Sequence, residues 1–406
     1  MLQKHVCQNG LRIVLEEIPA VRSVTIGIWI KTGSRNEGKE NNGMSHFLEH
    51  MFFKGTSTRS AKDIAEAFDA IGGQVNAFTS KEYTCYYAKV LDTHKNYALE
   101  VLADMFFNSK FDKDEMEREK KVVLEEIKMS EDTPDDIVHD LLSKASFGSH
   151  PLGYPILGTE ATLASFEPED LRAYMEKNYG PDNIVISVAG NVNESFFNDI
   201  DRLFGSYTTS QSLDPYNAPA FIAEHVSRKK ETEQAHLCLG YNGFSIEDTS
   251  IYSLIVMNNV LGGSMSSRLF QEIREQRGLA YSVFSYHSSY LDNGLLTIYT
   301  GTSKEHLPLL RETIDHTIKD LIDNGLTDKE LRNSKEQLKG SLMLSLESTN
   351  SRMSRNGKNE LLLRRHKTLD QMIADIDAVT HTSTSEVIQK IFGNSHSSAL
   401  ISSDEL

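Results

Sequence analysis

The order of predicted strands and helices repeats once along the 406-residue chain, and this repeat restricts the possible folds more than any other feature. In each half, hydrophobic periodicity predicts a strand, two helices, two strands and a further helix. The first copy covers residues 24–33, 46–53, 60–73, 74–79, 83–91 and 94–109, and the second covers 235–244, 249–261, 266–276, 280–290, 294–302 and 306–322. The chain therefore resembles a duplicated unit of about 200 residues.

A polar stretch separates the two copies. Residues 207–219 read YTTSQSLDPYNAP, with two prolines and no hydrophobic period, which is typical of a linker. A chain of 406 residues is also long enough to bury two cores. The sequence therefore predicts two domains, 1–208 and 220–406, joined by a linker at 209–219.

Composition narrows the class of protein. Hydrophobic residues make up 39% of the chain and charged residues 25%, values typical of a water-soluble globular protein, and no apolar run is long enough to cross a membrane. The net charge of -16 disfavours nucleic acid and anionic membranes as partners. A cationic substrate would suit this charge, although an acidic surface more often only keeps a protein in solution.

The cysteines and the N-terminal segment indicate in which cellular compartment the protein is expected. Cys7, Cys85 and Cys238 are odd in number and far apart, so neither a disulfide framework nor a cysteine zinc site is expected. The N-terminal segment has no apolar signal-peptide core, because Glu16 and Glu17 interrupt it. We therefore expect a cytoplasmic protein.

The side chains best suited to chemistry lie in the segment HFLEH, residues 46–50. On an α-helix, at about 100° per residue, His46, Glu49 and His50 share one face. Two imidazoles one turn apart can bind a single Zn²⁺, while an adjacent carboxylate can take a proton from water. The alternative is a helix whose histidines bind nothing. The other faces of this helix are strongly apolar, which would bury the histidines beside a carboxylate and favours a bound cation.

A third ligand is expected on the charged helix predicted at residues 112–129. Its sequence changes from charged to apolar at 122–124, so carboxylates emerge beside a buried stripe. Glu119 and Glu126 are seven residues apart and face the same way on a helix, which lets one bind the metal while the other supports it. For any single glutamate on such a helix, a solvated surface position is an equal alternative.

With these residues, the sequence resembles the pitrilysin family of inverted-motif zinc peptidases, and within it the mitochondrial processing peptidase β subunit and its bacterial processing-protease relatives. The resemblance implies that His46, His50 and Glu126, which lies 76 positions after His50, bind one Zn²⁺ per chain. It implies that Glu119 is the family's additional helix glutamate near the metal. The implied activity is a zinc metalloendopeptidase, in which a zinc-bound water attacks the peptide carbonyl with Glu49 as general base.

Two further passages resemble substrate-binding motifs of the family. GGQVNAFTSKEYT places Asn76, Ala77 and Phe78 on a strand that pairs with an extended peptide, although an internal sheet strand is the alternative. GGSMSSRLFQEIREQRGLAYSV resembles the C-terminal signature of the family. That resemblance implies that Arg274 and Tyr281 donate hydrogen bonds to the substrate near the zinc.

Asp136 and Asp140 are four residues apart on a predicted helix that follows Glu126. The processing peptidase has acids in this region that recognise arginine just before the cut, so the resemblance implies charge-assisted binding of a basic peptide. A solvent-exposed acidic helix start is an equal alternative.

The resemblance also implies the fold and the assembly. The expected fold is α+β, with two similar domains that each form a mainly antiparallel sheet with helices packed on one face. Two-domain relatives pair up, and this chain holds both the zinc residues and Arg274 with Tyr281, so a homodimer enclosing a chamber for unfolded peptides is expected. A non-catalytic binding or assembly subunit of the same fold and a non-proteolytic zinc hydrolase are the alternatives.

Overall fold

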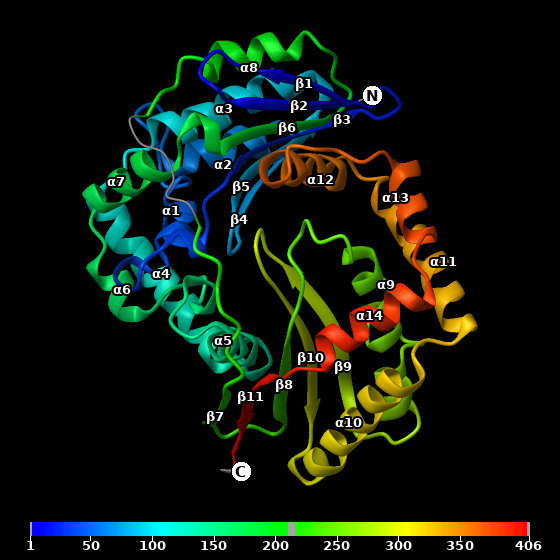
Figure 1. Ribbon diagram of the computed structural model, residues 1–406. Helices are drawn as coiled ribbons and strands as arrows, with labels where there is room; N and C mark the ends of the chain where they lie inside the picture. The colour runs from blue at the N-terminus through cyan, green and yellow to red at the C-terminus, as the bar shows by residue number, and fades with distance from the viewer. Residues whose placement is uncertain (1, 210–215, 404–406) are drawn as a thin grey trace. The chain divides into compact units, whose positions relative to one another are not determined.

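The computed structural model describes residues 2–209 and 216–403, which form two compact units of an α+β fold (Figure 1). The described residues of the N-terminal unit fall within Met1–Lys128, Pro155–Tyr216 and Ser345–His366, and those of the C-terminal unit within Met129–Tyr154, Asn217–Leu344 and Lys367–Leu406. The predicted two-domain α+β class is confirmed. Each unit is built from three separate segments, however, whereas the predicted domains 1–208 and 220–406 are continuous. Residues 210–215 of the predicted linker lie outside the described residues.

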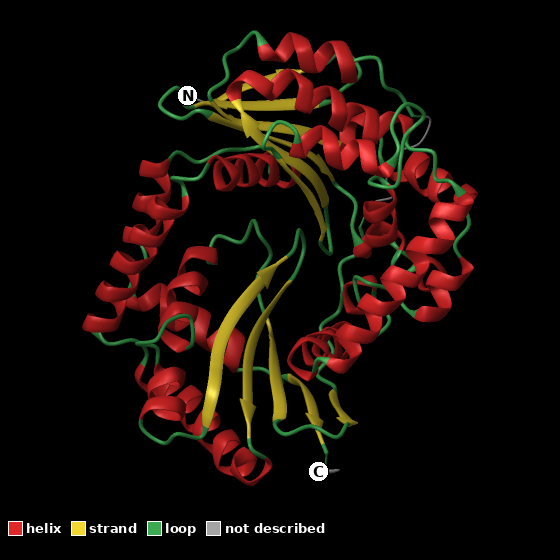
Figure 2. Cartoon of the chain, turned by 180° about the vertical axis from the view of Figure 1, so that it is seen from behind, coloured by secondary structure: helices red, strands yellow, loops and turns green. Residues whose placement is uncertain are grey.

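The described strands of the N-terminal unit form one six-stranded sheet in the order β1-β2-β6-β3-β5-β4 (Figure 2). Its strands are β1 (Leu2–Val6), β2 (Arg12–Glu17), β3 (Ser23–Ile30), β4 (Gln74–Thr79), β5 (Thr84–Leu91) and β6 (Ile184–Gly190). Neighbouring strands are antiparallel except β2 and β6, which run parallel. β1 and β4 are therefore the two edges of this sheet.

The described strands of the C-terminal unit form a five-stranded sheet in the order β7-β11-β8-β10-β9. Its strands are β7 (His225–Lys229), β8 (Ala235–Asn242), β9 (Ala280–Ser289), β10 (Gly294–Thr302) and β11 (Ser397–Ser402). Here β7 and β11 run parallel and the other pairs are antiparallel. The order and directions match those of β2-β6-β3-β5-β4, so strand pairing agrees with the predicted duplication.

Helices surround both sheets. The N-terminal unit contains α1 (Met44–Met51), α2 (Ala61–Asp69), α3 (Lys95–Asn108), most of α4 (Lys113–Asp132), α6 (Glu160–Ser165), α7 (Pro168–Asn178), α8 (Phe196–Phe204) and α12 (Thr349–Leu362). The C-terminal unit contains α5 (Pro134–Phe147), α9 (Ile251–Leu261), α10 (Leu307–Asn324), most of α11 (Asp328–Ser345), α13 (Leu369–Asp377) and α14 (His381–Phe392). Among the described helices, none combines the length and the apolar character needed to cross a lipid bilayer.

Both faces of the N-terminal sheet carry helices. Successive side chains of a strand point to opposite faces. On β3, Ile26 and Ile28 lie in the core that the sheet shares with α1, α2 and α3, whereas Thr25 and Trp29 contact α12. The predicted arrangement has helices on one face of the sheet only. In the structure, α12 covers part of the other face.

The C-terminal sheet is covered in the same way. On β8, Leu237 and Leu239 lie in the core formed with α9, α10 and α14, whereas Cys238 packs with Ile137 and Leu142 of α5. α5 follows α4 in the first half of the sequence and α12 follows α11 in the second. Each half of the duplicated chain thus gives one helix to the sheet of the other half, which explains why neither unit is a continuous segment.

Trp29, the single tryptophan of the chain, packs against α12. Its indole Nε1–H points at Met353 Sδ at 3.2 Å, and a Cβ added to Gly357 would lie 2.3 Å from the same nitrogen. Arg352, one turn earlier, forms an ion pair with Glu16 of β2. α12 therefore approaches the sheet so closely that position 357 has room only for hydrogen.

Gly357→Ala should weaken the docking of α12 and change the fluorescence of Trp29. Because overpacking a buried contact typically costs about 1–3 kcal/mol, we expect a loss of that size in the free energy of unfolding, with a red-shifted emission. Denaturation followed by tryptophan fluorescence measures both.

The matched control is Gly340→Ala on α11. Gly340 is exposed and an added Cβ there meets no atom within 4 Å, so helix propensity alone should raise stability by about 0.5–1 kcal/mol. If Gly357→Ala kept the wild-type emission and gained stability as the control does, the described packing would be wrong.

Candidate metal centre

The helix that carries HFLEH, α1, begins at a well-defined point. Gly43 precedes it with φ of 94°, a left-handed conformation that favours glycine, and a Cβ there would lie 2.7 Å from the carbonyl oxygen of Leu157. The Glu37 carboxylate, only 1% exposed, accepts hydrogen bonds from the backbone N–H groups of Gly43 at 2.8 Å and Ser45 at 2.7 Å. These bonds satisfy free N–H groups at the helix start and place a carboxylate at the positive end of the helix. Glu37 therefore holds α1 in position.

The apolar side of α1 determines where its polar side points. Phe47, Leu48 and Met51 are at most 1% exposed and pack into the core of the N-terminal unit. The face that remains presents the predicted His46 and His50, whose ring centroids lie 4.7 Å apart. The predicted helical arrangement of HFLEH is present in the structure.

Glu126 of α4 completes a group of three side chains that could hold a metal ion. Its Oε1 lies 3.7 Å from His46 Nε2, and its Oε2 lies 3.5 Å from His50 Nε2. One donor atom from each residue lies within 4.8 Å of the other two. Donors bound at about 2.1 Å to a tetrahedral ion are roughly 3.4 Å apart, so the observed separations fit one ion.

Burial keeps His46 neutral. Burial and, after it, the neighbouring His50 lower the pKa of His46 to about 3. Neutral imidazole is the form that binds a metal. His46 Nδ1 is buried and has no hydrogen-bond partner among the described residues, so Nε2 is the nitrogen directed at the other donors. Two imidazoles and one carboxylate, with a fourth position left open, are a donor set that fits catalytic Zn²⁺.

Glu119, the second predicted glutamate of α4, orients His50. Its Oε1 lies 2.8 Å from His50 Nδ1, and its Oε2 lies 2.6 Å from Lys54 Nζ. Burial lowers the pKa of His50, but the hydrogen bond and the charge of Glu119 outweigh burial and raise that pKa above its ordinary value. A carboxylate on Nδ1 leaves Nε2 free to face Glu126, which is how supporting carboxylates orient metal-binding histidines.

Glu49 lies beside these residues but is not one of the three grouped donors. The hydroxyl of Thr79, at the end of β4, donates a hydrogen bond of 2.5 Å to Glu49 Oε2. Burial raises the pKa of Glu49, and the Thr79 hydrogen bond and His50 offset part of this rise. A carboxylate with a raised pKa and a fixed orientation is suited to accept and release a proton.

A cavity of about 450 Å³ opens beside Glu49 and His50. Asn76 of β4, Lys54 and Glu119 also line it, together with five apolar residues: Phe53, Ala61, Ile64, Ala65 and Val75. The predicted residues Asn76, Ala77 and Phe78 all lie on β4, which pairs with β5 alone among the described strands. β4 is therefore an edge strand next to the metal centre, not an internal one.

The other predicted site residues lie in the C-terminal unit. Tyr281 is 77% exposed at the start of β9, and the Arg274 guanidinium carbon lies 4.5 Å from the centroid of its ring. Asp136 is exposed and Asp140 is half-buried, one turn apart on α5. The structure thus brings Arg274 to Tyr281 and places both aspartates on one helix, in a different unit from the metal centre.

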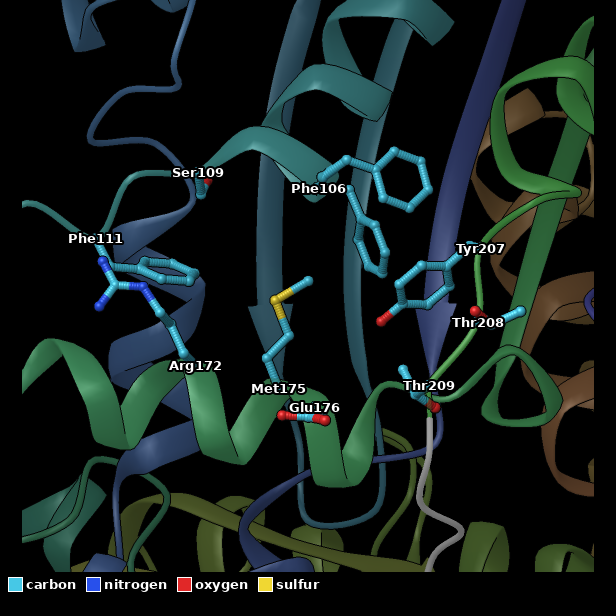
Figure 3. Close-up of a pocket in the computed structure, with 10 residues that line it drawn as sticks. Phe106, Ser109, Phe111, Arg172, Met175, Glu176, Tyr207, Thr208 and Thr209 are labelled. Atoms are coloured by element: carbon cyan, nitrogen blue, oxygen red, sulfur yellow. The ribbon is translucent and has the colours of Figure 1, made fainter.

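A second cavity of the N-terminal unit, of about 580 Å³, lies between α3, α7 and Tyr207 (Figure 3). Aromatic rings and Met175 face its interior, and Arg172 and Glu176 belong to its lining. Burial and the charge of Glu176 raise the pKa of Tyr207 to about 12, so its hydroxyl stays protonated. The predicted site residues are all described and none lines this cavity, so the candidate site remains the metal centre.

Sequence reasoning missed three residues around the metal centre: Glu37, Lys54 and Thr79. Glu37 and Thr79 reach α1 only through the folded chain, and nothing in their spacing indicated this contact. Lys54 lies beyond the end of α1 and reaches Glu119 of α4 only in the folded chain, so its spacing gave no signal either.

Comparisons with known proteins identify the family of this chain. Residues 12–160 match the family model described as Insulinase (Peptidase family M16), and residues 165–338 match the Peptidase M16 inactive domain. The chain is 64% identical over 402 residues to the "Uncharacterized zinc protease YmxG" of Bacillus subtilis, covering 99% of this chain and 98% of that protein. It is 42% identical over 410 residues to an uncharacterized zinc protease of Streptomyces coelicolor, covering 97% and 88%. The chain belongs to peptidase family M16, and the predicted relationship to pitrilysin-type zinc peptidases is confirmed.

Two solved structures share the fold. A protease from Helicobacter pylori matches with a TM-score of 0.92 at 21% identity, covering 99% of both chains. A peptidase M16 inactive domain from Pseudomonas fluorescens matches with a TM-score of 0.92 at 20% identity, covering 99% of this chain and 97% of that one. At these identities the likeness concerns the fold alone, and it confirms the two-domain α+β arrangement.

Glu126→Gln should release the metal, because it removes the negative charge from one of three donors. We expect zinc affinity to fall by at least about tenfold, measured as zinc per chain after dialysis against a graded chelator.

Glu125→Gln is the matched control on the same helix. The Glu125 side chain is 73% exposed and pairs with Lys128 at 2.7 Å, so this variant should retain zinc like the wild type. Equal zinc content in the two variants would contradict the assignment of Glu126.

Proposed function

We propose that this protein is a zinc metalloendopeptidase that hydrolyses extended or unfolded peptides. The observation that carries the proposal is the convergence of His46, His50 and Glu126 beside a separately held carboxylate, Glu49. Relatives named zinc proteases support both the peptidase activity and the metal. Zn²⁺ bound there, one ion per chain, would supply Lewis acidity to the attacking water and the peptide carbonyl.

The side chains around the metal have separate tasks in this proposal. Glu49 accepts a proton from the attacking water and passes it to the leaving amine nitrogen. Its pKa, raised by burial, brings its proton affinity closer to that required near neutral pH. Thr79 keeps the Glu49 carboxylate in one orientation, and Glu119 does the same for the His50 ring.

Substrate binding is assigned to the edge of β4. An extended peptide can add to a free sheet edge through backbone hydrogen bonds, which bind many sequences with similar affinity. Asn76, Ala77 and Phe78 would provide this edge, and the position of Asn76 in the cavity beside Glu49 supports the assignment. The five apolar residues on one part of the lining of that cavity favour an apolar substrate side chain next to the scissile bond.

Glu49→Gln should abolish cleavage while zinc is retained, because an amide cannot accept the proton yet Glu49 is not a metal donor. Loss of a general base typically lowers kcat by about 10²–10⁴-fold. Cleavage of a quenched basic peptide and zinc per chain are measured on the same preparation. Undiminished cleavage would exclude Glu49 as the general base.

The same variant separates the alternative functions. A non-catalytic binding or assembly subunit would show no peptide cleavage even in the wild-type chain loaded with zinc. A non-proteolytic zinc hydrolase would lose activity toward a small ester or amide while never cleaving peptides. The grouping of both histidines with Glu126, and the presence of Glu49 on the same helix, supports the peptidase over the binding subunit.

A homodimer is the assembly that we propose, with each zinc centre completed by the C-terminal unit of the other subunit. Arg274 and Tyr281 would then donate hydrogen bonds to the substrate carbonyl or its oxyanion. The 77% exposure of Tyr281 and the contact of Arg274 with its ring support a pair that is available to another molecule. Asp136 and Asp140 are assigned to a basic substrate side chain, since two carboxylates one turn apart suit a guanidinium.

Mixing inactive variants tests the shared site. Glu49→Gln chains and Arg274→Ala chains are each expected to be inactive or strongly impaired. If sites are completed across the dimer, a mixed dimer regains one site with both intact halves, and peptide cleavage returns. The control is a mixture of two differently tagged Glu49→Gln chains, which also verifies subunit exchange. No recovery despite exchange would reject the shared site while leaving the zinc assignment intact.

A further inference from the structure

A second group of metal-binding side chains lies at the edge of the N-terminal sheet opposite β4. His5 belongs to the edge strand β1, Cys7 follows this strand, and Asp201 lies on α8, which runs beside it (Figure 1). One donor atom from each residue lies within 4.8 Å of the other two. Because β1 and β4 are opposite edges of the sheet, this group is separate from the metal centre on α1 and α4.

The chain around Cys7 is held in place by backbone contacts. His5 and Cys7 are two residues apart on nearly extended chain, so their side chains point the same way. The Cys7 N–H donates to the carbonyl oxygen of Leu11 at 2.8 Å, which closes the turn. The Asn9 side chain donates to the carbonyl oxygen of Phe204 at 2.8 Å, which fixes the turn against the end of α8. Two of the donors are therefore positioned before any ion arrives.

The third donor comes from the facing side of α8. Phe197 and Asp201 are four residues apart on this helix and share a face. The His5 ring lies 5.5 Å from the ring of Phe197, and a carboxylate oxygen of Asp201 lies within 4.8 Å of the Cys7 sulfur. Cys7 is 4% exposed, whereas His5 and Asp201 are exposed, so the sulfur lies at the inner end of a group that solvent reaches.

We propose that His5, Cys7 and Asp201 form a second site for a thiophilic divalent ion, which is Zn²⁺ under cellular conditions. One sulfur, one imidazole and one carboxylate donor suit Zn²⁺, whereas Mg²⁺ and Ca²⁺ prefer oxygen donors alone. On binding, the S–H bond of Cys7 breaks, its proton leaves to solvent, and a sulfur–metal bond forms.

The ion would connect the N-terminal strand to α8 and stabilise this edge of the sheet. The alternative explanation is that no metal binds and that the Cys7 thiol only forms a hydrogen bond with the Asp201 carboxylate. His5 has no role in that alternative but is a ligand in the metal site, so substitution of His5 distinguishes the two explanations.

Cobalt absorption of the full-length chain tests the proposal. The centre on α1 and α4 has no sulfur donor, so a sulfur-to-cobalt charge-transfer band after addition of Co²⁺ reports a thiolate ligand elsewhere. We expect the band in the wild type and its loss in Cys7→Ser. Cys85→Ser is the matched control, because Cys85 is also a buried free cysteine, and it should keep the band.

Two further variants keep the outcome decisive. His5→Gln, at an exposed position, should raise the Co²⁺ dissociation constant read from the band by at least about tenfold. Glu126→Gln should leave the band unchanged, so failure of the catalytic assignment and failure of this site are distinguished. Absence of the band in the wild type at saturating Co²⁺, its survival in Cys7→Ser, or an unchanged dissociation constant in His5→Gln would overturn the proposal.

Discussion

The burial of α1 against the N-terminal sheet is the interaction on which the candidate site depends. Burying a side chain such as Phe47, Leu48 or Met51 contributes roughly 1.5–3 kcal/mol. Leaving one polar group buried without a partner, as at His46 Nδ1, costs about 1–3 kcal/mol. The three apolar side chains together outweigh that cost, so the helix stays buried with His46 and His50 facing Glu126 of α4. The position of both histidines and the neutral state of His46 thus follow from the same packing.

Negative charge gathers around that helix, and the chain offsets only part of it. Glu49 lies on α1, Glu37 and Glu119 contact this helix, and Glu126 faces it from α4. Glu37 is satisfied by N–H groups at the helix start, and Lys54 pairs with Glu119. Against the effect of burial, Glu119 and, after it, Glu126 and Glu49 still raise the pKa of His50 above its ordinary value. A divalent cation would relieve this repulsion better than further hydrogen bonds, since bound ions are often the largest charges in a site.

Local patterns predicted the elements of this site because the information lies within one or two helical turns. HFLEH shows its shared face by spacing alone, and Glu119 and Glu126 are separated by two turns of one helix. Choosing Glu126 over Glu119 as the metal ligand needed the family resemblance, because the helical pattern alone left both possible. Glu37 and Thr79 were not predictable, since their contacts with α1 arise from chain segments that meet only after folding.

The domain boundaries were hard to predict for a related reason. The sequence marks a linker by proline and polar composition near residue 210, but the chain passes between the two units five times. Two of these passages lie within helices, after residue 128 in α4 and after residue 344 in α11, where composition does not change. The close contact of Gly357 with Trp29 could not be predicted either, because nothing in the sequence shows that this helical glycine lies against Trp29.

The exchange of α5 and α12 also orders events during synthesis. The three candidate metal ligands are all present once residue 126 has been made, yet the sheet beneath them gains its second covering layer only when α12, which ends at Leu362, leaves the ribosome. Until then, the face that carries Trp29 lacks the helix that covers it. The second half of the sequence, which contains no predicted metal ligand, thus supplies the helix that completes the N-terminal unit. During translation, the candidate metal ligands are therefore made well before this supporting helix.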